Sequence, residues 1–527
     1  MPGGPGQTDD SPRMDDAQRW ARGAYYTPSD AAHFIATWAL RGIGERFLEP
    51  SFGDGAFIRA VADVAAARGW ERPTWIASEL NAAVAASAVR DGLLRKEELH
   101  VGDFLERDVS PVDAVIANPP YVRLRHLAQK DRNLALRRAE EALGTGMSPS
   151  GSLWMPFVIH MVSHLKHGGR AAMVLPLDFT YVAYARPLWD FLASRFGSLR
   201  VLRTRQRVFA DLNQDVMIVL ADEHGGSTAS LSYEAYERVD DLVAGTNAIG
   251  GAVSLRDIAA GERPFQQALL PDGLADLLNA VEDRFVRAGQ LATFRIGYVA
   301  GDKRFFHPTQ PTIDSLPLPR RSLKRTLTNS RRLRGRGLRS GLMGTDDTDF
   351  LWTPGDELTE GEKRYVELGE SLGVHQGYKA RMRKQWFRVP GVAPPDVVLS
   401  VFSERPLLVV NDAHFLASNS LLGGYVHDAN IEGFAAAWYT PLTLLSIGLQ
   451  VHSLGGGVMI MVPNEASRVR IPLPEIAHRD LAGTHAALMA GDMRSAYAEG
   501  DKVAEQIVGK TGLKLVYQGI ERLSYWR

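Results

Sequence analysis

The chain has 527 residues, of which 45% are hydrophobic, contains no cysteine, and carries a formal net charge of -1. The absence of cysteine excludes disulfides, thiolate zinc sites and cysteine nucleophiles, including the attacking cysteine that methylation of cytosine carbon 5 requires. This length predicts two or three domains. Because no run approaches 18 uncharged apolar residues and residues 1–16 lack an apolar signal core, we expect a cytoplasmic protein without a membrane segment.

Residues 1–19 are predicted to be a flexible tail, and residues 20–245 a first domain in which apolar runs alternate with helical patterns. This βαβ rhythm is typical of a doubly wound α/β sheet. Two late runs are too close for a crossover helix and should pair antiparallel, which gives seven strands with an antiparallel edge strand. The expected strands are residues 46–49, 74–79, 99–103, 112–117, 170–176, 199–203 and 215–220.

A glycine-rich turn follows the first expected strand. Glu49, Pro50, Gly53 and Gly55 lie between that strand and a helical pattern that begins near Ile58. Such a turn brings backbone close to a ligand, although glycine pairs after strands also form plain tight turns.

Two acidic residues end the next two strands. Glu79 and Asp103 should meet at the carboxyl edge of the sheet, where open α/β sheets bind ligands. One carboxylate can accept from ribose hydroxyls and the other from an adenine amino group. Asp103 could instead only cap a helix, and Phe104 after it could only be a core aromatic.

The tetrapeptide Asn118-Pro119-Pro120-Tyr121 ends the fourth expected strand. Its prolines fix the backbone so that the Asn118 side-chain oxygen and a carbonyl can face one point, with the ring of Tyr121 beside it. A planar amino group of a base fits such a place. The alternative is a rigid turn, but a strand that ends in Pro-Pro needs a reason.

Three histidines, His160, His164 and His167, have helical spacing within an expected helix over residues 153–166. They resemble metal ligands, but neither an acidic partner nor a cysteine accompanies them in the sequence. Since the rest of this helix is apolar, we expect it to pack on the sheet with the histidines on its wetter face, and we predict no metal.

Residues 246–527 are predicted to form a second, mixed α+β domain with strands at 396–401 and 407–410 and helices near 270–287 and 482–508. Residues 301–400 carry 18 Lys and Arg against 12 Asp and Glu. Nine basic residues without an acidic one lie between Arg320 and Arg339, and Tyr378 to Arg388 interleaves aromatic and basic residues. Both runs suit a DNA surface, or else a solvated loop and an ordinary strand. The candidate DNA contacts are Arg320, Arg321, Lys324, Arg331, Arg332, Arg334, Lys379, Arg381, Arg383, Lys384 and Trp386.

In this order, the motifs resemble those of the TaqI-like, gamma-class adenine-N6 DNA methyltransferases, which use S-adenosylmethionine. The resemblance covers about residues 20–225 and is looser after 245, where Gly455-Gly456-Gly457 and Ile471 to Pro474 are similar to parts of the family's specificity domain. It implies catalytic roles for Asn118, Pro119, Tyr121 and Phe209, with Phe209 and Tyr121 holding a flipped adenine. It implies cofactor contacts for Thr27 (in Tyr25-Tyr26-Thr27-Pro28), Glu49, Pro50, Gly53, Gly55, Glu79, Asp103, Phe104, Asn118 and Pro120.

The implied function is methylation of adenine N6 in double-stranded DNA, in restriction-modification or phage defence, with a separate nuclease or defence subunit as a possible partner. Three alternatives stay open. Release-factor glutamine N5 methyltransferases share Asn-Pro-Pro-Tyr, but lack the motif that ends at Pro28, the Glu49-Pro50 loop and a long basic second domain. The chain could also be a DNA-binding subunit with an inactive methylase fold, or a fused nuclease, for which we find no carboxylate-and-lysine constellation.

Overall fold

The computed structural model describes residues 28–206, 215–344, 346, 348–453 and 458–527. Thr27, Phe209 and Gly455 to Gly457 therefore lie outside the described residues, as does the predicted tail. The chain divides into two units, residues 1–269 and 270–527. Within the described ranges, no helix combines the length and the apolar character needed to cross a membrane.

The first unit is built on one nine-stranded sheet in the order β3-β2-β1-β4-β5-β7-β6-β8-β9. Strands β1 to β5 are parallel, and β7 runs antiparallel between β5 and β6. The strands are β1 (Arg46–Glu49), β2 (Thr74–Glu79), β3 (Leu99–Val101), β4 (Val112–Ala117), β5 (Leu165–Pro176), β6 (Phe196–Thr204), β7 (Val216–His224), β8 (Ser230–Tyr236) and β9 (Ile249–Ser254).

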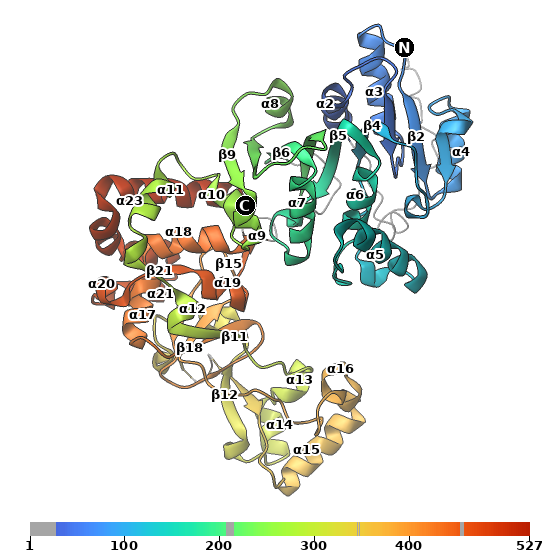
Figure 1. The fold of residues 1–527 in the computed structure, drawn as a ribbon. Coiled ribbons are helices and arrows are strands. Elements are labelled where there is room, and N and C mark those ends of the chain that lie inside the picture. The colour runs from blue at the N-terminus through green and yellow to red at the C-terminus, as the bar shows by residue number, and fades with distance from the viewer. Residues whose placement is uncertain (1–27, 207–214, 345, 347, 454–457) are drawn as a thin grey trace, which may run out of the picture. The chain divides into compact units, whose positions relative to one another are not determined.

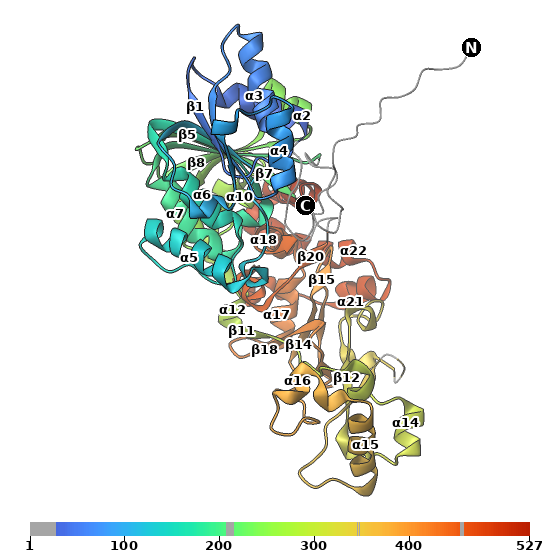
Figure 2. The ribbon, with the colours of Figure 1, turned by 90° about the vertical axis from the view of Figure 1, so that its right-hand side faces the viewer.

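Helices cover both faces of this sheet, as expected of a doubly wound fold. Helices α2, α3 and α4 lie on one face, and α5, α6 and α7 on the other (Figure 1, Figure 2). The helices are α2 (Ser29–Ala39), α3 (Ala56–Ala67), α4 (Ala82–Arg90), α5 (Gln129–Leu143), α6 (Trp154–Val162), α7 (Arg186–Ala193), α8 (Val239–Ala244), α9 (Leu255–Ala259) and α10 (Pro264–Gln267).

The predicted α/β sheet is confirmed, with two differences in detail. The antiparallel strand β7 is inserted between β5 and β6 rather than placed at the edge. Strands β8 and β9 extend the sheet to nine strands, because β8 pairs parallel with β6 and β9 pairs antiparallel with β8. The boundary predicted near residue 245 consequently falls inside the first unit, between α8 and β9.

The predicted helix over residues 153–166 ends earlier. Helix α6 stops at Val162 and β5 begins at Leu165, so the three histidines do not share one helix. His160 is 4% exposed rather than on a wet face, because its Nε2 lies 2.7 Å from the carbonyl oxygen of Arg107 and its ring packs 4.9 Å from that of Phe104.

The second unit contains a four-stranded sheet, β11-β18-β14-β16, and a three-stranded sheet, β13-β12-β17. The predicted strands near 396–401 and 407–410 are β14 and β16. The strands are β10 (Phe285–Arg287), β11 (Ala292–Ile296), β12 (Leu323–Leu327), β13 (Asp349–Trp352), β14 (Val397–Ser400), β15 (Phe402–Ser403), β16 (Leu408–Val410), β17 (Leu416–Ala417), β18 (Leu421–Val426), β19 (His452–Ser453), β20 (Met459–Ile460) and β21 (Arg470–Pro472).

Helices surround these sheets, and α17 and α18 bury most of their residues in the core of the unit. The helix expected near 270–287 ends at Ala280. The pattern near 482–508 is divided among three helices. The helices are α11 (Leu274–Ala280), α12 (Ala288–Leu291), α13 (Lys303–Phe306), α14 (Gln310–Ser315), α15 (Glu360–Ser371), α16 (Tyr378–Arg381), α17 (Ile431–Trp438), α18 (Pro441–Gln450), α19 (Pro463–Arg468), α20 (Pro474–Ala477), α21 (Ala482–Met489), α22 (Met493–Ala498) and α23 (Asp501–Tyr525).

A buried carboxylate, Glu98, connects β2 to the segment before β3. Its side chain is 1% exposed and accepts hydrogen bonds from Arg72, Arg95 and the backbone N–H of Trp75. Burial alone would raise the pKa of Glu98, but these hydrogen bonds outweigh it and lower the pKa to about 2. The charged form of Glu98 therefore stabilises the folded state.

Replacing Glu98 by Gln should lower the free energy of unfolding by about 2 kcal/mol at neutral pH, since Arg72 and Arg95 lose a charged partner. The folded pKa lies below the unfolded value of about 4.3, so this contribution is complete above that value and is lost as the pH falls towards 2. Denaturant unfolding at several pH values measures it. Glu97→Gln, at an exposed neighbour, is the control, and equal stability of the two variants would contradict the assignment.

Candidate active site

The carboxyl ends of four parallel strands place the predicted site residues at one edge of the sheet. Glu49 ends β1, Glu79 ends β2, Asp103 follows β3 and Asn118 follows β4. Parallel pairing of β1 with β2 and β4, and of β2 with β3, brings these four ends together. The strand order reverses between β1 and β4, which is the topological switch point where such sheets bind ligands.

The glycine-rich turn after β1 connects the neighbouring strand ends. The Gly53 N–H donates to Glu79 Oε2 at 3.1 Å, and the Ser51 hydroxyl donates to the Asn118 carbonyl at 3.4 Å. Gly53 and Gly55 have φ of 55° and 78°, a left-handed conformation that other residues adopt with strain. Gly55 is also the N-cap residue, immediately before α3. The two glycines are thus required by the shape of the turn.

Glu49 is a buried acid with an unused oxygen. It is 2% exposed, and its Oε2 is buried without a hydrogen-bond partner in the described part of the chain. Burial, reinforced by the nearby carboxylate of Asp54, raises the pKa of Glu49 well above its usual value, and Arg59 only partly opposes this. A cationic ligand group would supply the missing donor.

Glu79 and Asp103 are already engaged with backbone. Glu79 Oε1 accepts from the Asn81 N–H at 2.8 Å, in addition to its bond from Gly53. Asp103 Oδ1 accepts from the Leu105 N–H at 2.9 Å and caps the short helix η2 (Phe104–Glu106). Burial raises the pKa of Asp103. Each carboxylate has further lone pairs, so both can still accept from a ligand.

Phe104 is 1% exposed, and its ring packs against Phe157 and His160. The structure thus places the side chain of Phe104 in the core, which is the role of a core aromatic that the sequence also allowed.

Pro28 immediately precedes α2, whose first residue is Ser29.

The Asn-Pro-Pro-Tyr segment leaves β4 with Pro119 buried and Asn118, Pro120 and Tyr121 half-buried. The Tyr121 hydroxyl lies 2.9 Å from Asn118 Oδ1 and 2.9 Å from the carbonyl oxygen of Val174 on β5. The ring of Tyr121 is partly buried and packs against the hydrophobic core of the first unit. Asn118 and Tyr121 are therefore held in direct contact.

Sequence reasoning missed a polar cluster after β5. Asp178 is 9% exposed, its Oδ1 has no hydrogen-bond partner among the described residues, and burial raises its pKa. Arg123 donates to the hydroxyl of Tyr184 at 3.0 Å and lies 3.6 Å from Asp178 Oδ2. Asp178 and Tyr184 are near neighbours in the sequence, but Arg123 comes from a distant segment, so no local signal connects it to them.

A second group that sequence reasoning missed contains Asp108, His160 and His164, whose possible metal-ligand atoms all lie within 4.8 Å of one another. An acidic partner for the histidines therefore exists. Arg138 lies 3.1 Å from Asp108 Oδ1, and its charge adds to burial in lowering the pKa of both histidines. The guanidinium of Arg138 thus already pairs with the carboxylate of Asp108. That this group binds no metal stays a prediction.

Only part of each basic run in the second unit faces solvent. Arg332 pairs with Asp349 at 2.8 Å, and Arg383 donates to the carbonyl oxygens of Val299 and Ala300. Trp386 packs on Phe305. These residues stabilise the unit. Among the candidate DNA contacts, the exposed basic residues are Arg320, Arg321, Lys324, Arg331, Arg334, Lys379, Arg381 and Lys384.

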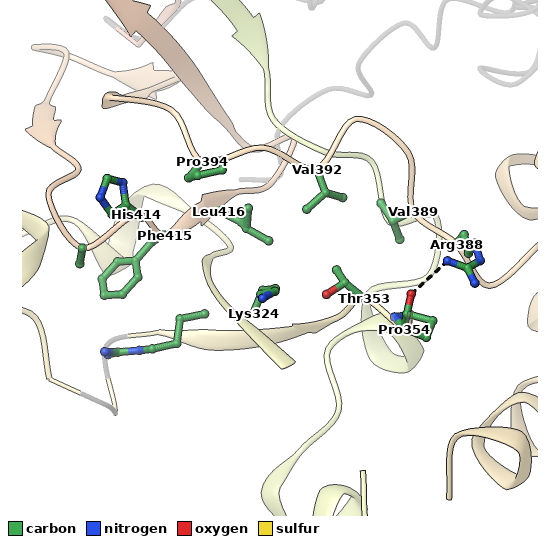
Figure 3. A pocket seen from close by; sticks show the side chains of 12 residues that line it. Lys324, Thr353, Pro354, Arg388, Val389, Val392, Pro394, His414, Phe415 and Leu416 are labelled. Atoms are coloured by element: carbon green, nitrogen blue, oxygen red, sulfur yellow. Dashed lines mark hydrogen bonds between the residues drawn. The ribbon is translucent and has the colours of Figure 1, made fainter. Parts of the chain in front are cut away.

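Two cavities, each of more than 700 Å³, lie on either side of the loop formed by residues 388–395. Lys324, Arg325 and Arg388 line the first together with Phe415, and Figure 3 shows Arg388 held by the Pro354 carbonyl. The second is lined by residues that include Arg295, Lys379 and Tyr425. The second unit thus presents basic hollows with apolar walls.

Comparisons with known proteins agree with this geometry. Residues 15–183 match the N-6 DNA Methylase family, and residues 262–504 match the C-terminal domain of Type II methyltransferase M.Eco57I. The chain is 24% identical over 481 residues to Type II methyltransferase M.XamI of Xanthomonas campestris pv. amaranthicola, covering 86% of each. It is 18% identical over 412 residues to Type II methyltransferase M.AccI of Acinetobacter calcoaceticus, covering 74% of this chain and 72% of the relative.

Among solved structures, the Type IIL restriction-modification enzyme MmeI in complex with DNA matches 97% of this chain and 80% of its own, with a TM-score of 0.54 and 12% identity. This likeness concerns the fold of both units. The first family match lies within the first structural unit, the second lies almost entirely within the second unit, and together they span most of the sequence. Together with the Type II methyltransferase relatives, these matches indicate that the chain is a DNA N6-adenine methyltransferase of the restriction-modification type.

Proposed function

We propose that this methyltransferase takes its methyl group from S-adenosylmethionine and transfers it to an adenine rotated out of duplex DNA, at Asn118 to Tyr121. The observation that carries the proposal is the convergence of Glu49, Glu79, Asp103 and Asn118 at the switch point of the sheet. The order of the motifs supports the gamma class. A separate restriction nuclease or defence-system subunit remains a predicted partner.

The acidic strand ends fit the chemistry of this cofactor. The buried, unpartnered Oε2 of Glu49 suits the ammonium group of its methionine part. The lone pairs left on Glu79 suit ribose hydroxyls, and those on Asp103 suit an adenine amino group. The turn at Gly53 and Gly55 lets backbone approach the ligand. When bound, S-adenosylmethionine supplies an electrophilic methyl group.

The residues after β4 provide acceptors for the target amino group. The lone pair of an adenine amino nitrogen is delocalised into the ring, which makes the nitrogen a weak nucleophile. Acceptance of its two hydrogens by the Asn118 side-chain oxygen and the Pro119 carbonyl would localise that pair and stabilise the positive charge that develops on nitrogen. Neither acceptor has to remove a proton before transfer, so positioning supplies much of the rate.

A duplex hides this amino group within the base stack, so the base has to leave the stack at a cost of a few kcal/mol. Stacking on the ring of Tyr121, worth about 1–3 kcal/mol per base, would offset part of this cost. The resemblance assigns the opposite face of the base to Phe209, which lies outside the described residues. Phosphate contacts from the exposed basic residues of the second unit would offset the rest of the cost of base flipping.

Asn118→Ala should lower the rate of methyl transfer at least a hundredfold, because the acceptor aimed at the developing charge is removed. Binding of S-adenosylmethionine should change little. Transfer of tritiated methyl groups to DNA and calorimetric titration with the cofactor measure the two effects. Turnover within a few-fold of the wild type would contradict the assigned role of Asn118.

Binding of S-adenosylmethionine should release a proton from Glu49. The raised pKa keeps Glu49 protonated in the free protein at pH values below that pKa, whereas an ammonium partner favours the charged form. Affinity should therefore rise with pH until the raised pKa is reached and then level off.

Calorimetry in two buffers of different ionisation enthalpy counts the released protons. Glu49→Gln should bind the cofactor more weakly and without this proton release. Glu71→Gln, at an exposed position in the same unit, is the control. Equal proton release by the wild type and Glu49→Gln would show that another group is responsible.

The exposed basic residues Lys379, Arg381 and Lys384 should contact DNA phosphates. Replacing all three by Gln should weaken DNA binding and reduce the slope of log K against log salt by about 0.9 for each phosphate that is no longer neutralised. Cofactor affinity should stay unchanged. Filter binding over a range of salt concentrations measures the slope.

A matched control replaces the three exposed lysines Lys502, Lys510 and Lys514 on α23 by Gln, with the same change of charge. If both triple variants lose DNA affinity equally, the effect is one of net charge and the assigned surface is wrong.

A further inference from the structure

The hydroxyl of Tyr121 lies between two oxygen atoms. Asn118 Oδ1 and the Val174 carbonyl oxygen are each 2.9 Å from it. A hydroxyl has one hydrogen and can donate to only one of them, while its lone pairs can accept. The backbone carbonyl of Val174 can only accept. The hydroxyl therefore has one hydrogen for these two contacts. If both partners were acceptors, one of the two oxygens would face a lone pair of the hydroxyl oxygen at 2.9 Å.

The chemistry of the two partners indicates which contact receives the hydrogen, because the Val174 carbonyl cannot donate whereas the Asn118 amide can. Pairing between β4 and β5 ends at Ala117 and Met173, so Val174 is the next residue after that ladder. Tyr121, four residues beyond the end of β4, reaches back to the Val174 carbonyl. With the hydroxyl hydrogen on Val174, the contact with Asn118 requires a donor on the asparagine.

The side-chain amide of Asn118 can provide that donor. A half-turn about its last side-chain bond exchanges Oδ1 and Nδ2 at almost the same positions. Nδ2 then donates to the Tyr121 hydroxyl, the hydroxyl donates to Val174, and each of the two short contacts holds one hydrogen. The oxygen of the amide consequently faces away from Tyr121.

We propose that the Tyr121 hydroxyl is a positioning group, which fixes the orientation of the Asn118 amide through a relay from Asn118 Nδ2 to Tyr121 to the Val174 carbonyl. This inference rests on the proposed function and adds to it. The ring of Tyr121 stacks on the base, whereas its hydroxyl turns the Asn118 oxygen towards the target amino group. In the opposite orientation, two amino groups would face one another, and no acceptor would meet the substrate.

Tyr121→Phe keeps the ring and removes the relay. The rate of methyl transfer in a single turnover should fall about 10- to 100-fold, since the acceptor is no longer held in its productive orientation. The KM for DNA and the affinity for S-adenosylmethionine should stay within a factor of about two, because stacking and cofactor contacts remain. A rate equal to that of the wild type would overturn the proposal.

The carboxylate variant Asn118→Asp separates orientation from other effects of the hydroxyl. A carboxylate presents an oxygen in both directions and needs no orienting donor. In the Asn118→Asp background, Tyr121→Phe should therefore lower the rate by no more than about twofold. An equal loss in both backgrounds would show that the hydroxyl does not act through the amide.

If Asn118→Asp has no measurable rate, NMR of the Asn118 side-chain amide tests the relay directly. In the full-length protein with 15N-labelled asparagine, the side-chain NH2 resonances of Asn118, assigned by their loss in Asn118→Asp, should shift in Tyr121→Phe. Unchanged resonances would overturn the relay. Methyl transfer by the wild type is measured first, so that failure of the proposed function is distinguished from failure of the relay.

Discussion

The contacts made by the turn after β1 are the constraint on which the site depends. The amide of Gly53 donates to Glu79, and the hydroxyl of Ser51 donates to the carbonyl of Asn118, so one short turn connects the proposed cofactor side of the site to its proposed acceptor side. Methyl transfer requires the methyl group and the accepting nitrogen to lie in line, and a small displacement is costly. A turn that contacts both sides adds to the strand pairing in fixing their relative position.

Electrostatics at this edge of the sheet follow from burial. Glu49, Asp54 and Asp103 all have raised pKa values, with burial as the leading cause in each, and Glu49 and Asp54 also repel one another. Such a group of acids is unfavourable by itself and becomes favourable beside a cation. The electrostatics of the site therefore favour a positively charged ligand. This agrees with a cofactor that carries an ammonium and a sulfonium group.

The parallel strands, the glycine turn and the Asn118 segment could be predicted from sequence, because each depends on a local pattern of apolar runs, turn residues and strand ends. What remained hidden depends on contacts between distant segments. His160 is buried because the carbonyl of Arg107 accepts its hydrogen bond, and the Tyr121 hydroxyl meets Val174 on another strand. The extension of the sheet by β8 and β9 also depended on pairing that composition does not reveal. In the second unit, Arg383 belongs to a basic run in the sequence, yet in the structure its side chain donates hydrogen bonds to the backbone carbonyls of Val299 and Ala300.

Methylation of adenine in living cells tests the central claim most directly. DNA from a host that expresses the wild-type chain should carry N6-methyladenine at one recurring sequence when read by a method that detects modified bases on single molecules, and DNA from a host that expresses Asn118→Ala should not. Methylation of cytosine N4 at that sequence, or equal adenine methylation with both chains, would contradict the account of the site around Asn118.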